Sequence, residues 1–477
     1  MAGTLPLELL SQIAGYLNHG GESLVPYTVV CRRWQPVFEQ FIYSKNLVVH
    51  STGDVDESPQ PGISLTRFTA LTSGVGMARR AWIRHVQYNI VVPYELPDWT
   101  TRKHKGYQLK NPLLNSWGSG HRLSLQLGLV GREQGEEPCT SSYPDAWEYT
   151  WEFRNGRTKA TKPYRACFPN HDASMLPQVA CIHKLSFMRI YEPSGVERDH
   201  QVWAQAIFQI VQHCPTIVEL HVDLDYLTRP DQLEYIQARR QAVSDGLSIV
   251  PRSLQVFGFI NQKEGPWKTS MPALNVLSSE VDRLAVTLRD LSFSLRVLKL
   301  NKLSLSLDFL CPLDDDGQPK TTSLCWPHLE VIELSSIPPW LPSGKWLLRP
   351  KPEAEADIAA IDDWEEEICH SERGHVARRI MEVEQFHRLF ISLGYAARHM
   401  PRLTSLQFNL NATVQLNFKF AAGVDGVSAT WSAKVDYRPD QRVAAAWGFR
   451  EDDLQPGFPW RTYTLQLNNW PPDEVQS

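Results

Sequence analysis

The chain has no long hydrophobic run. In its 477 residues no apolar stretch approaches the roughly 18 residues of a membrane span, and the N-terminus lacks a basic region followed by an apolar signal core. With a formal net charge of -5, the chain also lacks the basic excess typical of proteins that bind nucleic acid or anionic lipid. We therefore expect a cytoplasmic and/or nuclear protein with no nucleic-acid or membrane partner.

Catalytic and cofactor motifs are also missing. No P-loop, dinucleotide glycine fingerprint, His-Glu-x-x-His or Gly-x-Ser-x-Gly occurs. The 8 cysteines are scattered without a Cys-x-x-Cys pair, which favours reduced and mostly buried thiols. Cys369, His370 and His375 form the tightest cluster of metal-binding residue types, but adjacent helix positions point to different faces and no second pair lies nearby. The sequence predicts no enzyme, no metal and no cofactor.

The main positive feature is a recurring Leu-x-x-Leu-x-Leu pattern in which other apolar residues are allowed. Its copies start at residues 83, 182, 217, 254, 295, 329 and 403. The last two apolar positions of each copy are two residues apart, as in a strand that buries one face. The middle positions should then be equivalent and buried: Leu185, Leu220, Phe257, Leu298, Ile332 and Leu406.

Apolar stripes at helical spacing lie before several copies, at residues 202–211, 274–291 and 386–397. Most copies start 34 to 41 residues after the previous one, and the last interval is about twice as long, which predicts an insertion there. Repeated helix, turn and short strand is typical of a leucine-rich-repeat solenoid with long, irregular units.

The sequence thus predicts an α/β protein with helical, solenoid and antiparallel parts. Helices occupy residues 1–48, and a leucine-rich-repeat-like solenoid occupies 75–411, with insertions near 132–180 and 312–370. Residues 412–470 alternate apolar and polar side chains, which predicts a small antiparallel sheet that caps the array. The acidic run 352–367 is interpreted as a solvated face, with a regulatory acidic segment as the alternative.

The first 45 residues are rich in apolar side chains at helical spacing. One cluster runs from Leu5 to Leu17 and includes Tyr16, and a second runs from Val29 to Tyr43. Thr4 and Ser23 are candidate helix caps, and Pro26 fits a first helical turn. So short a segment does not form a stable core unless it packs against something. It is interpreted as half of an interface; the alternative is a helical hairpin that packs on its own domain.

These residues resemble an F-box, the motif that docks onto the Skp-type linker of cullin–RING ubiquitin ligases. The resemblance implies linker binding through Leu5, Pro6, Leu9, Leu10, Ile13, Leu17, Val30 and Trp34. The whole chain is similar to a large group of filamentous-fungal F-box proteins with a functionally unassigned repeat region, through 82–86, 342–346 and 398–403.

The function that this resemblance implies is substrate recognition for a Skp–cullin–F-box type ubiquitin ligase. Linker and cullin would be the partners at the N-terminus, and an unknown protein target would bind the repeats. The alternatives are an F-box scaffold acting outside a ligase and an enzyme without a recognisable motif.

Target-binding candidates follow from strand geometry, because residues beside the buried pair point to the opposite, concave face of a solenoid. They are Gln87, Asn89, Ser186, Met188, His221, Asp223, Lys299, Asn301, Glu333, Gln407 and Asn409. Recognition by loops, including the two insertions, is the alternative.

Overall fold

The computed structural model describes most of the chain. Its described residues are 5–51, 62–92, 117–131 except 119, 164–166, 168, 173–187, 200–224 and 233–261, then 272–352 except 322 and 323. Beyond these they are 378–457 except 413, 424 and 425, then 461–467 and 470–471. Within these ranges no helix is long and apolar enough to cross a membrane. The acidic run after Pro352, with Cys369, His370 and His375, lies outside the described residues, as do Thr4 and Met188.

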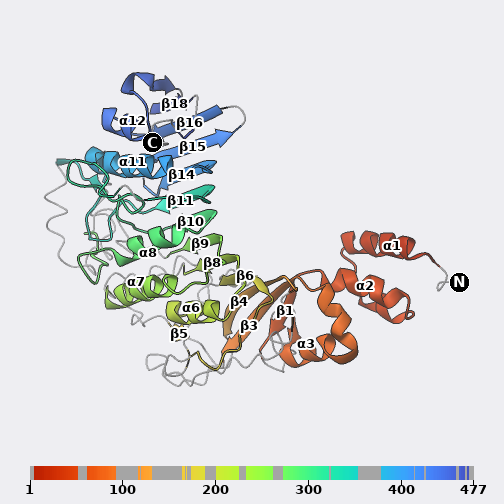
Figure 1. Ribbon diagram of the computed structural model, residues 1–477. Helices are drawn as coiled ribbons and strands as arrows, with labels where there is room; N and C mark the ends of the chain where they lie inside the picture. Colours follow the sequence, from red (N-terminus) through yellow and green to blue (C-terminus); the bar gives the residue numbers. More distant parts are fainter. Residues whose placement is uncertain are drawn as a thin grey trace.

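One 14-stranded sheet forms the body of the protein (Figure 1). Its parallel strands are, in chain order, β1 Leu47–His50, β2 Ile63–Ser64, β3 His85–Val92, β4 Leu123–Gly131, β6 Ile182–Phe187, β8 Glu219–Asp223, β9 Val256–Ile260, β10 Val297–Asn301, β11 Val331–Ile337 and β14 Ser405–Leu410. Strand β11 pairs directly with β14, so the long interval between these two copies adds no strand to the sheet, as predicted. The sheet begins before residue 75, because β1 pairs with β3.

Helices alternate with the strands and stack in the same order (Figure 1). They are α3 Leu65–Thr72, α6 Ala204–Gln212, α7 Leu233–Leu247, α8 Arg283–Ser292, α11 Val383–Arg398 and α12 Gln441–Ala446, with the 3₁₀ helices η4 Gly74–Ala81 and η8 Glu451–Asp453. The predicted stripe at 386–397 lies in α11, and the stripe at 202–211 lies in α6 except for its first two residues, since Val202 ends β7 and Trp203 is the N-cap residue. The stripe at 274–291 is only half helical, because the Asp282 side chain caps α8 by accepting from the Ala285 amide. The 15-residue helix α7 has no predicted counterpart.

The predicted buried positions are confirmed as one row across the sheet. Leu185, Leu220, Phe257, Leu298, Ile332 and Leu406 are each the register partner of the next, and all are fully buried. The row continues through Leu125 to Val86 in the other direction. A repeat of roughly 37 residues has therefore placed one side chain per unit into a single continuous core.

The antiparallel C-terminal strands extend this same sheet instead of forming a separate one. They are β15 Asn417–Gly423, β16 Gly426–Ala433, β17 Gln455–Gly457 and β18 Arg461–Leu467, in the order β14-β15-β16-β18-β17. Both edge strands, β2 and β17, are very short, which limits the backbone that each edge exposes to another chain. Two further pairs lie outside the main sheet: β5 Tyr164–Ala166 with β7 His200–Val202, and β12 Leu348–Arg349 with β13 Ile380–Met381.

The N-terminal helices form a unit with its own small core. Helix α1 spans Leu7–His19, the 3₁₀ helix η2 spans Val25–Val29, and α2 spans Trp34–Tyr43. Figure 1 shows α1 and α2 projecting from the β1 end of the sheet. Pro26 lies in the first turn of η2, as expected, but no side chain caps this helix, so Ser23 does not act as the predicted cap. The predicted second helix is thereby divided into η2 and α2.

Candidate protein-interaction surfaces

Helix α1 carries two apolar stripes that lie about 100° apart around its axis. Leu10 and Ala14 are fully buried in the small core with Leu24, Val37 and Phe38, and Leu17 packs partly against it. Leu9, Ile13 and Tyr16 recur at the same three- and four-residue spacing but remain exposed, Tyr16 to 81%. One stripe therefore holds the unit together, and the second has no contact that buries it within the described chain.

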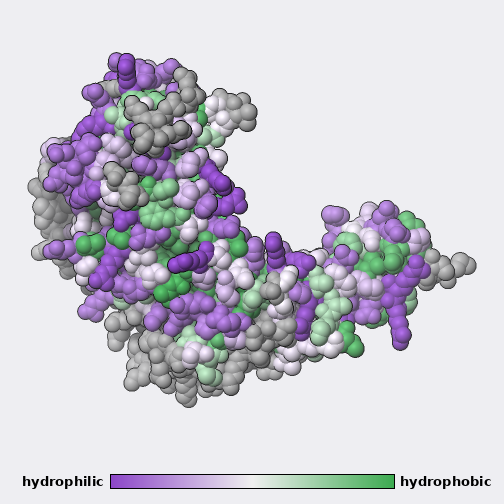
Figure 2. All heavy atoms as spheres, in the orientation of Figure 1, coloured by the Kyte–Doolittle hydropathy of each residue, from purple (hydrophilic) through white to green (hydrophobic). Residues whose placement is uncertain are grey.

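The exposed stripe belongs to a larger set of exposed apolar residues in the N-terminal unit. Half of the large hydrophobic side chains that are exposed among the described residues lie within residues 7–30: Leu7, Leu9, Ile13, Tyr16, Val25, Val29 and Val30. Figure 2 shows hydrophobic surface gathered on this N-terminal unit. We call these seven residues the N-terminal patch. An apolar concentration of this kind makes the N-terminal unit a candidate binding surface.

The predicted linker-binding residues divide between this patch and the small core. Leu9, Ile13 and Val30 belong to the patch, and Pro6 is an exposed residue that directly precedes α1. Leu5, Leu17 and Trp34 are half-buried against the small core, with the Trp34 ring stacked on Phe38 at 5.4 Å. The structure corrects the prediction for Leu10, which is fully buried because it faces α2 and not solvent.

Leu7, Val25 and Val29 were not among the predicted site residues, and Tyr16 was noted only as part of the helical pattern. Spacing gave a usable signal for Tyr16, which follows Leu9 by seven residues and Ile13 by three. It gave none for Val25 and Val29, because their exposure depends on the turn that η2 makes after Gly21.

An ion pair joins the N-terminal unit to the sheet. Arg79 of η4 donates from Nε and Nη2 to the two carboxylate oxygens of Glu39 on α2, at 3.1 and 2.6 Å. Arg79 also donates from Nη1 to the Leu71 carbonyl at 3.1 Å, and its guanidinium lies 5.6 Å from the Tyr43 ring centroid. Burial raises the pKa of the Tyr43 hydroxyl, against the opposing effect of the Arg79 charge. These contacts fix α2 against η4.

The sheet face opposite the helices carries the polar row that strand alternation predicts. We call it the open face. Its central row runs in register through Gln87, Gln126, Ser186, His221, Gly258, Lys299, Glu333 and Gln407. A second row brings together Asp223, Ile260 and Asn301, and Asn409 hydrogen-bonds to Asn417 of β15.

Most of the predicted target-binding residues lie on this face with at least part of the side chain accessible: Gln87, His221, Asp223, Lys299, Asn301, Glu333, Gln407 and Asn409. Asn89 is a correction, because it is fully buried between His50 of β1 and Gly128 of β4, and its side-chain oxygen accepts from Gln87. Ser186 lies in the central row but is also buried.

Several charged side chains on the open face form ion pairs with one another. Lys184 Nζ donates to Glu219 at 2.6 Å, and the His221 ring also hydrogen-bonds to this carboxylate. Burial opposes ionisation of Glu219, but the hydrogen bonds from Lys184 and His221 prevail and lower the pKa of the carboxyl group. Lys299 and Glu333 form a second pair at 3.1 Å. The open face therefore presents both signs of charge, with Lys419 of β15 as a further exposed cation in register with Gln407.

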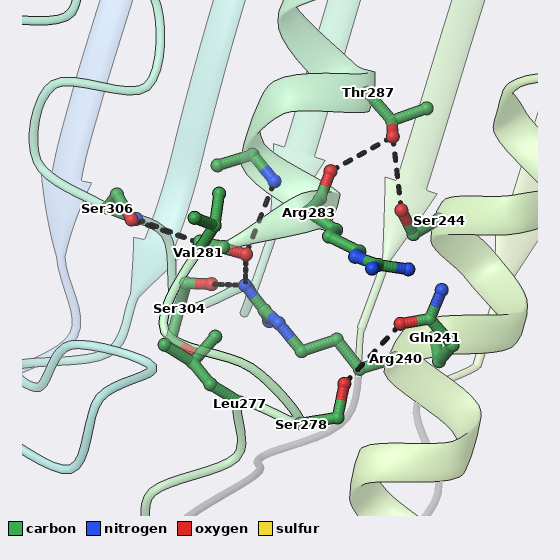
Figure 3. A network of polar contacts seen from close by, with 12 residues as sticks. Arg240, Gln241, Ser244, Leu277, Ser278, Val281, Arg283, Thr287, Ser304 and Ser306 are labelled. Atoms are coloured by element: carbon green, nitrogen blue, oxygen red, sulfur yellow. Dashed lines mark hydrogen bonds and ion pairs between the residues drawn. The ribbon is translucent and has the colours of Figure 1, made fainter.

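Behind the sheet, a buried polar network connects consecutive units (Figure 3). Arg240 of α7 donates to Asp282 at 2.8 Å and to the Ser304 carbonyl at 3.1 Å. Asp282 also accepts from the backbone and side chain of Ser306. Ser244 and Thr287 hydrogen-bond between α7 and α8 at 3.0 Å. The network joins two helices to the segment that follows β10, so it is structural in position.

No cluster of three or more His, Cys, Asp or Glu side chains that could hold a metal occurs within the described ranges. An apolar cavity of about 90 Å³ lies among β1, β3, β4, β6 and α6, lined by residues such as Phe68, Tyr88 and Leu127. Burial raises the pKa of Tyr88 to about 12, so its hydroxyl stays protonated at neutral pH. The lining is mostly apolar and includes three side chains with polar groups, Tyr88, His213 and Cys214.

Two surfaces therefore stand out: the N-terminal patch, which is apolar, and the open face, which is polar with paired charges. The two surfaces lie in different regions of the protein, the N-terminal unit and the sheet body, and the Glu39–Arg79 ion pair connects these regions. When the chain is compared with protein-family models, curated proteins and solved structures, it matches none of them.

Proposed function

We propose that this protein is the substrate-recognition adaptor of a Skp–cullin–F-box type ubiquitin ligase and acts in the cytoplasm or nucleus. The observation that carries the proposal is the second apolar stripe of α1, Leu9, Ile13 and Tyr16, which remains exposed beside a complete small core. Leaving such side chains in water is unfavourable unless a partner covers them. The flanking residues resemble an F-box, and this resemblance implies a Skp-type linker as that partner.

In this proposal the protein needs no catalytic residue of its own. The N-terminal patch binds the linker, the linker binds the cullin, and the sheet body holds a target protein. Transfer is accelerated because a bound target lysine stays at high effective concentration near the charged ubiquitin carrier. The Glu39–Arg79 pair supports this role by holding the two binding regions in one orientation.

The open face is the proposed target-binding surface. Its accessible side chains come from consecutive strands and offer hydrogen-bonding groups and both charges, which suits a mixed protein surface. Phosphate- or lipid-binding surfaces instead concentrate positive charge. Charge reversal at Asp223, Lys299 and Glu333 together should release a captured target while leaving linker binding intact.

The linker assignment is tested by replacing Ile13 and Tyr16 with Ser in the full chain. Both side chains are exposed, so the fold should persist, and co-purification of the linker and cullin should fall by at least about tenfold. Ile249→Ser is the matched control, because this isoleucine is similarly exposed but lies far from α1 in the sequence. Unchanged capture of the linker by the double variant would contradict the assignment.

Capture of the linker without a cullin would instead support a scaffold acting outside a ligase. The two outcomes are separated by probing the same purified material for both proteins. Neither outcome depends on knowing the target.

A further inference from the structure

The open face contains an aliphatic strip that the polar rows surround. Val256, Val297 and Val331 are register partners on β9, β10 and β11, and all three are half-buried. They point away from the buried row of Phe257, Leu298 and Ile332, because successive side chains of a strand alternate between faces. Adjacent strands lie about 4.8 Å apart, so the three valines form a strip roughly 10 Å long.

The His221 ring lies over Gly258 beside this strip. Gly258 of β9 has no side chain, and a Cβ there would come within 2.5 Å of the His221 ring. The imidazole of His221 thus leans across β9 next to Val256. The strip is therefore flanked by a flat aromatic surface, not by another protruding side chain.

The charges around the strip are already neutralised within the chain. Lys184 pairs with Glu219 at 2.6 Å, and Lys299 pairs with Glu333 at 3.1 Å. Glu219 is the register partner of Val256, while Lys299 and Glu333 lie two residues beyond Val297 and Val331. The strip and its surroundings thus have an apolar centre and a polar rim, the usual composition of a protein interface.

We propose that this strip binds an uncharged aliphatic segment of the target protein. Such a segment covers the three valines while the surrounding ion pairs stay formed. A charged segment would have to break one of these pairs to gain a new ion pair, and both lysines of the two pairs already have a carboxylate partner. The occupant is called a target because of the proposed function; the binding chemistry itself does not depend on it.

Synthetic peptides of equal length test the proposal on the full-length protein without linker. One set carries Leu, Ile and Val between neutral polar residues, and the others are acidic, basic or phosphoserine-containing. Fluorescence anisotropy should detect binding of the aliphatic set alone. Its Kd should change by less than about threefold between low and high salt, because few charges are neutralised on binding.

Variants locate the site. Val297→Asp should weaken binding of the aliphatic peptides at least about tenfold, and Val297→Ile should retain it. Ser428→Asp is the control, because Ser428 lies in the same row three strands beyond Val331. Circular dichroism and thermal unfolding check that each variant is folded.

The proposal is overturned if acidic, basic or phosphorylated peptides bind more tightly, if no peptide binds, or if Val297→Asp binds as the unaltered protein does. Linker capture through α1 is measured separately, so failure here leaves the adaptor assignment standing. Loss of linker capture would equally leave the peptide result standing.

Discussion

The N-terminal unit and the sheet body bury their apolar side chains to different extents. In the sheet body one core runs without interruption from Tyr43 to Leu465, and the repeat row is fully buried from Leu185 to Leu406. The separate core of the N-terminal unit consists of Leu10, Ala14, Leu24, Val37 and Phe38, while Tyr43 at the end of α2 packs into the core of the body and Val29 is left 83% exposed. Within the described residues the body therefore buries its repeat row completely, whereas the unit leaves several of its apolar side chains accessible.

The two regions also differ in what their buried polar side chains contact. The body buries the Arg240–Asp282 pair behind its sheet, where each side chain is about 5% exposed. The N-terminal unit uses its buried carboxylate, Glu39, to attach to the body. Internal polar contacts therefore join elements within the body, while Glu39 of the unit contacts Arg79 of the body.

The largest expected effect comes from breaking the polar network of the body. Asp282→Ala removes the α8 cap and leaves Arg240 buried without its carboxylate, which should cost about 3–5 kcal/mol in the free energy of unfolding. Urea denaturation measures it. The double variant Arg240→Met, Asp282→Leu should recover most of the loss, because no buried charge remains. A single variant within about 1 kcal/mol of the unaltered protein would show that the network is dispensable.

Two matched leucine truncations compare the two cores directly. Leu298 and Leu10 are both fully buried, and replacing either with Ala should cost about 2–5 kcal/mol. Hydrogen exchange should show Leu298→Ala lowering protection in β9, β10 and β11, and Leu10→Ala lowering it within residues 5–43 alone. If Leu10→Ala also weakens protection in the central strands, the two regions are one cooperative unit.

The sequence predicts the body better than the unit for a physical reason. A strand that buries one face shows period-two apolar alternation, and repetition places Leu220, Phe257 and Leu298 in one row without further information. Helix α7 has no such signal, since its buried face includes Arg239 and Arg240. Their burial depends on partners distant in sequence, such as Asp282.

In α1, Leu9 and Leu10 are both apolar and adjacent, so periodicity alone does not decide which one faces the core. The position of α2 decides it. For the same reason the sequence predicts an apolar surface on the N-terminal helices but does not specify each of its residues. The burial of Asn89 depends on neighbouring strands, which the alternation of β3 does not specify.

A smaller effect on stability is expected at the ion pair between the N-terminal unit and the sheet body. Arg79→Met removes the hydrogen bonds to Glu39 and Leu71, which should cost about 1–3 kcal/mol, chiefly as faster hydrogen exchange in α2 and η4. Arg67→Met is the control, because Arg67 is an exposed arginine on neighbouring α3. Equal exchange in both variants would mean that packing, not the ion pair, attaches the unit.

The smallest effect concerns Glu219 on the open face. Hydrogen bonds from Lys184 and His221 lower the pKa of its carboxyl group despite partial burial. A carboxyl group whose pKa is lower in the folded state stabilises the protein above its unfolded pKa, near 4.5, and loses that contribution as pH falls through the folded value. The amplitude should be under about 1 kcal/mol, because both side chains of the pair remain partly exposed. Lys184→Met should raise the pKa of Glu219, which an NMR titration of its side-chain carboxyl carbon measures directly. An unchanged pKa in that variant would assign the shift to His221, so the charge pairing of the open face would rest on a different contact.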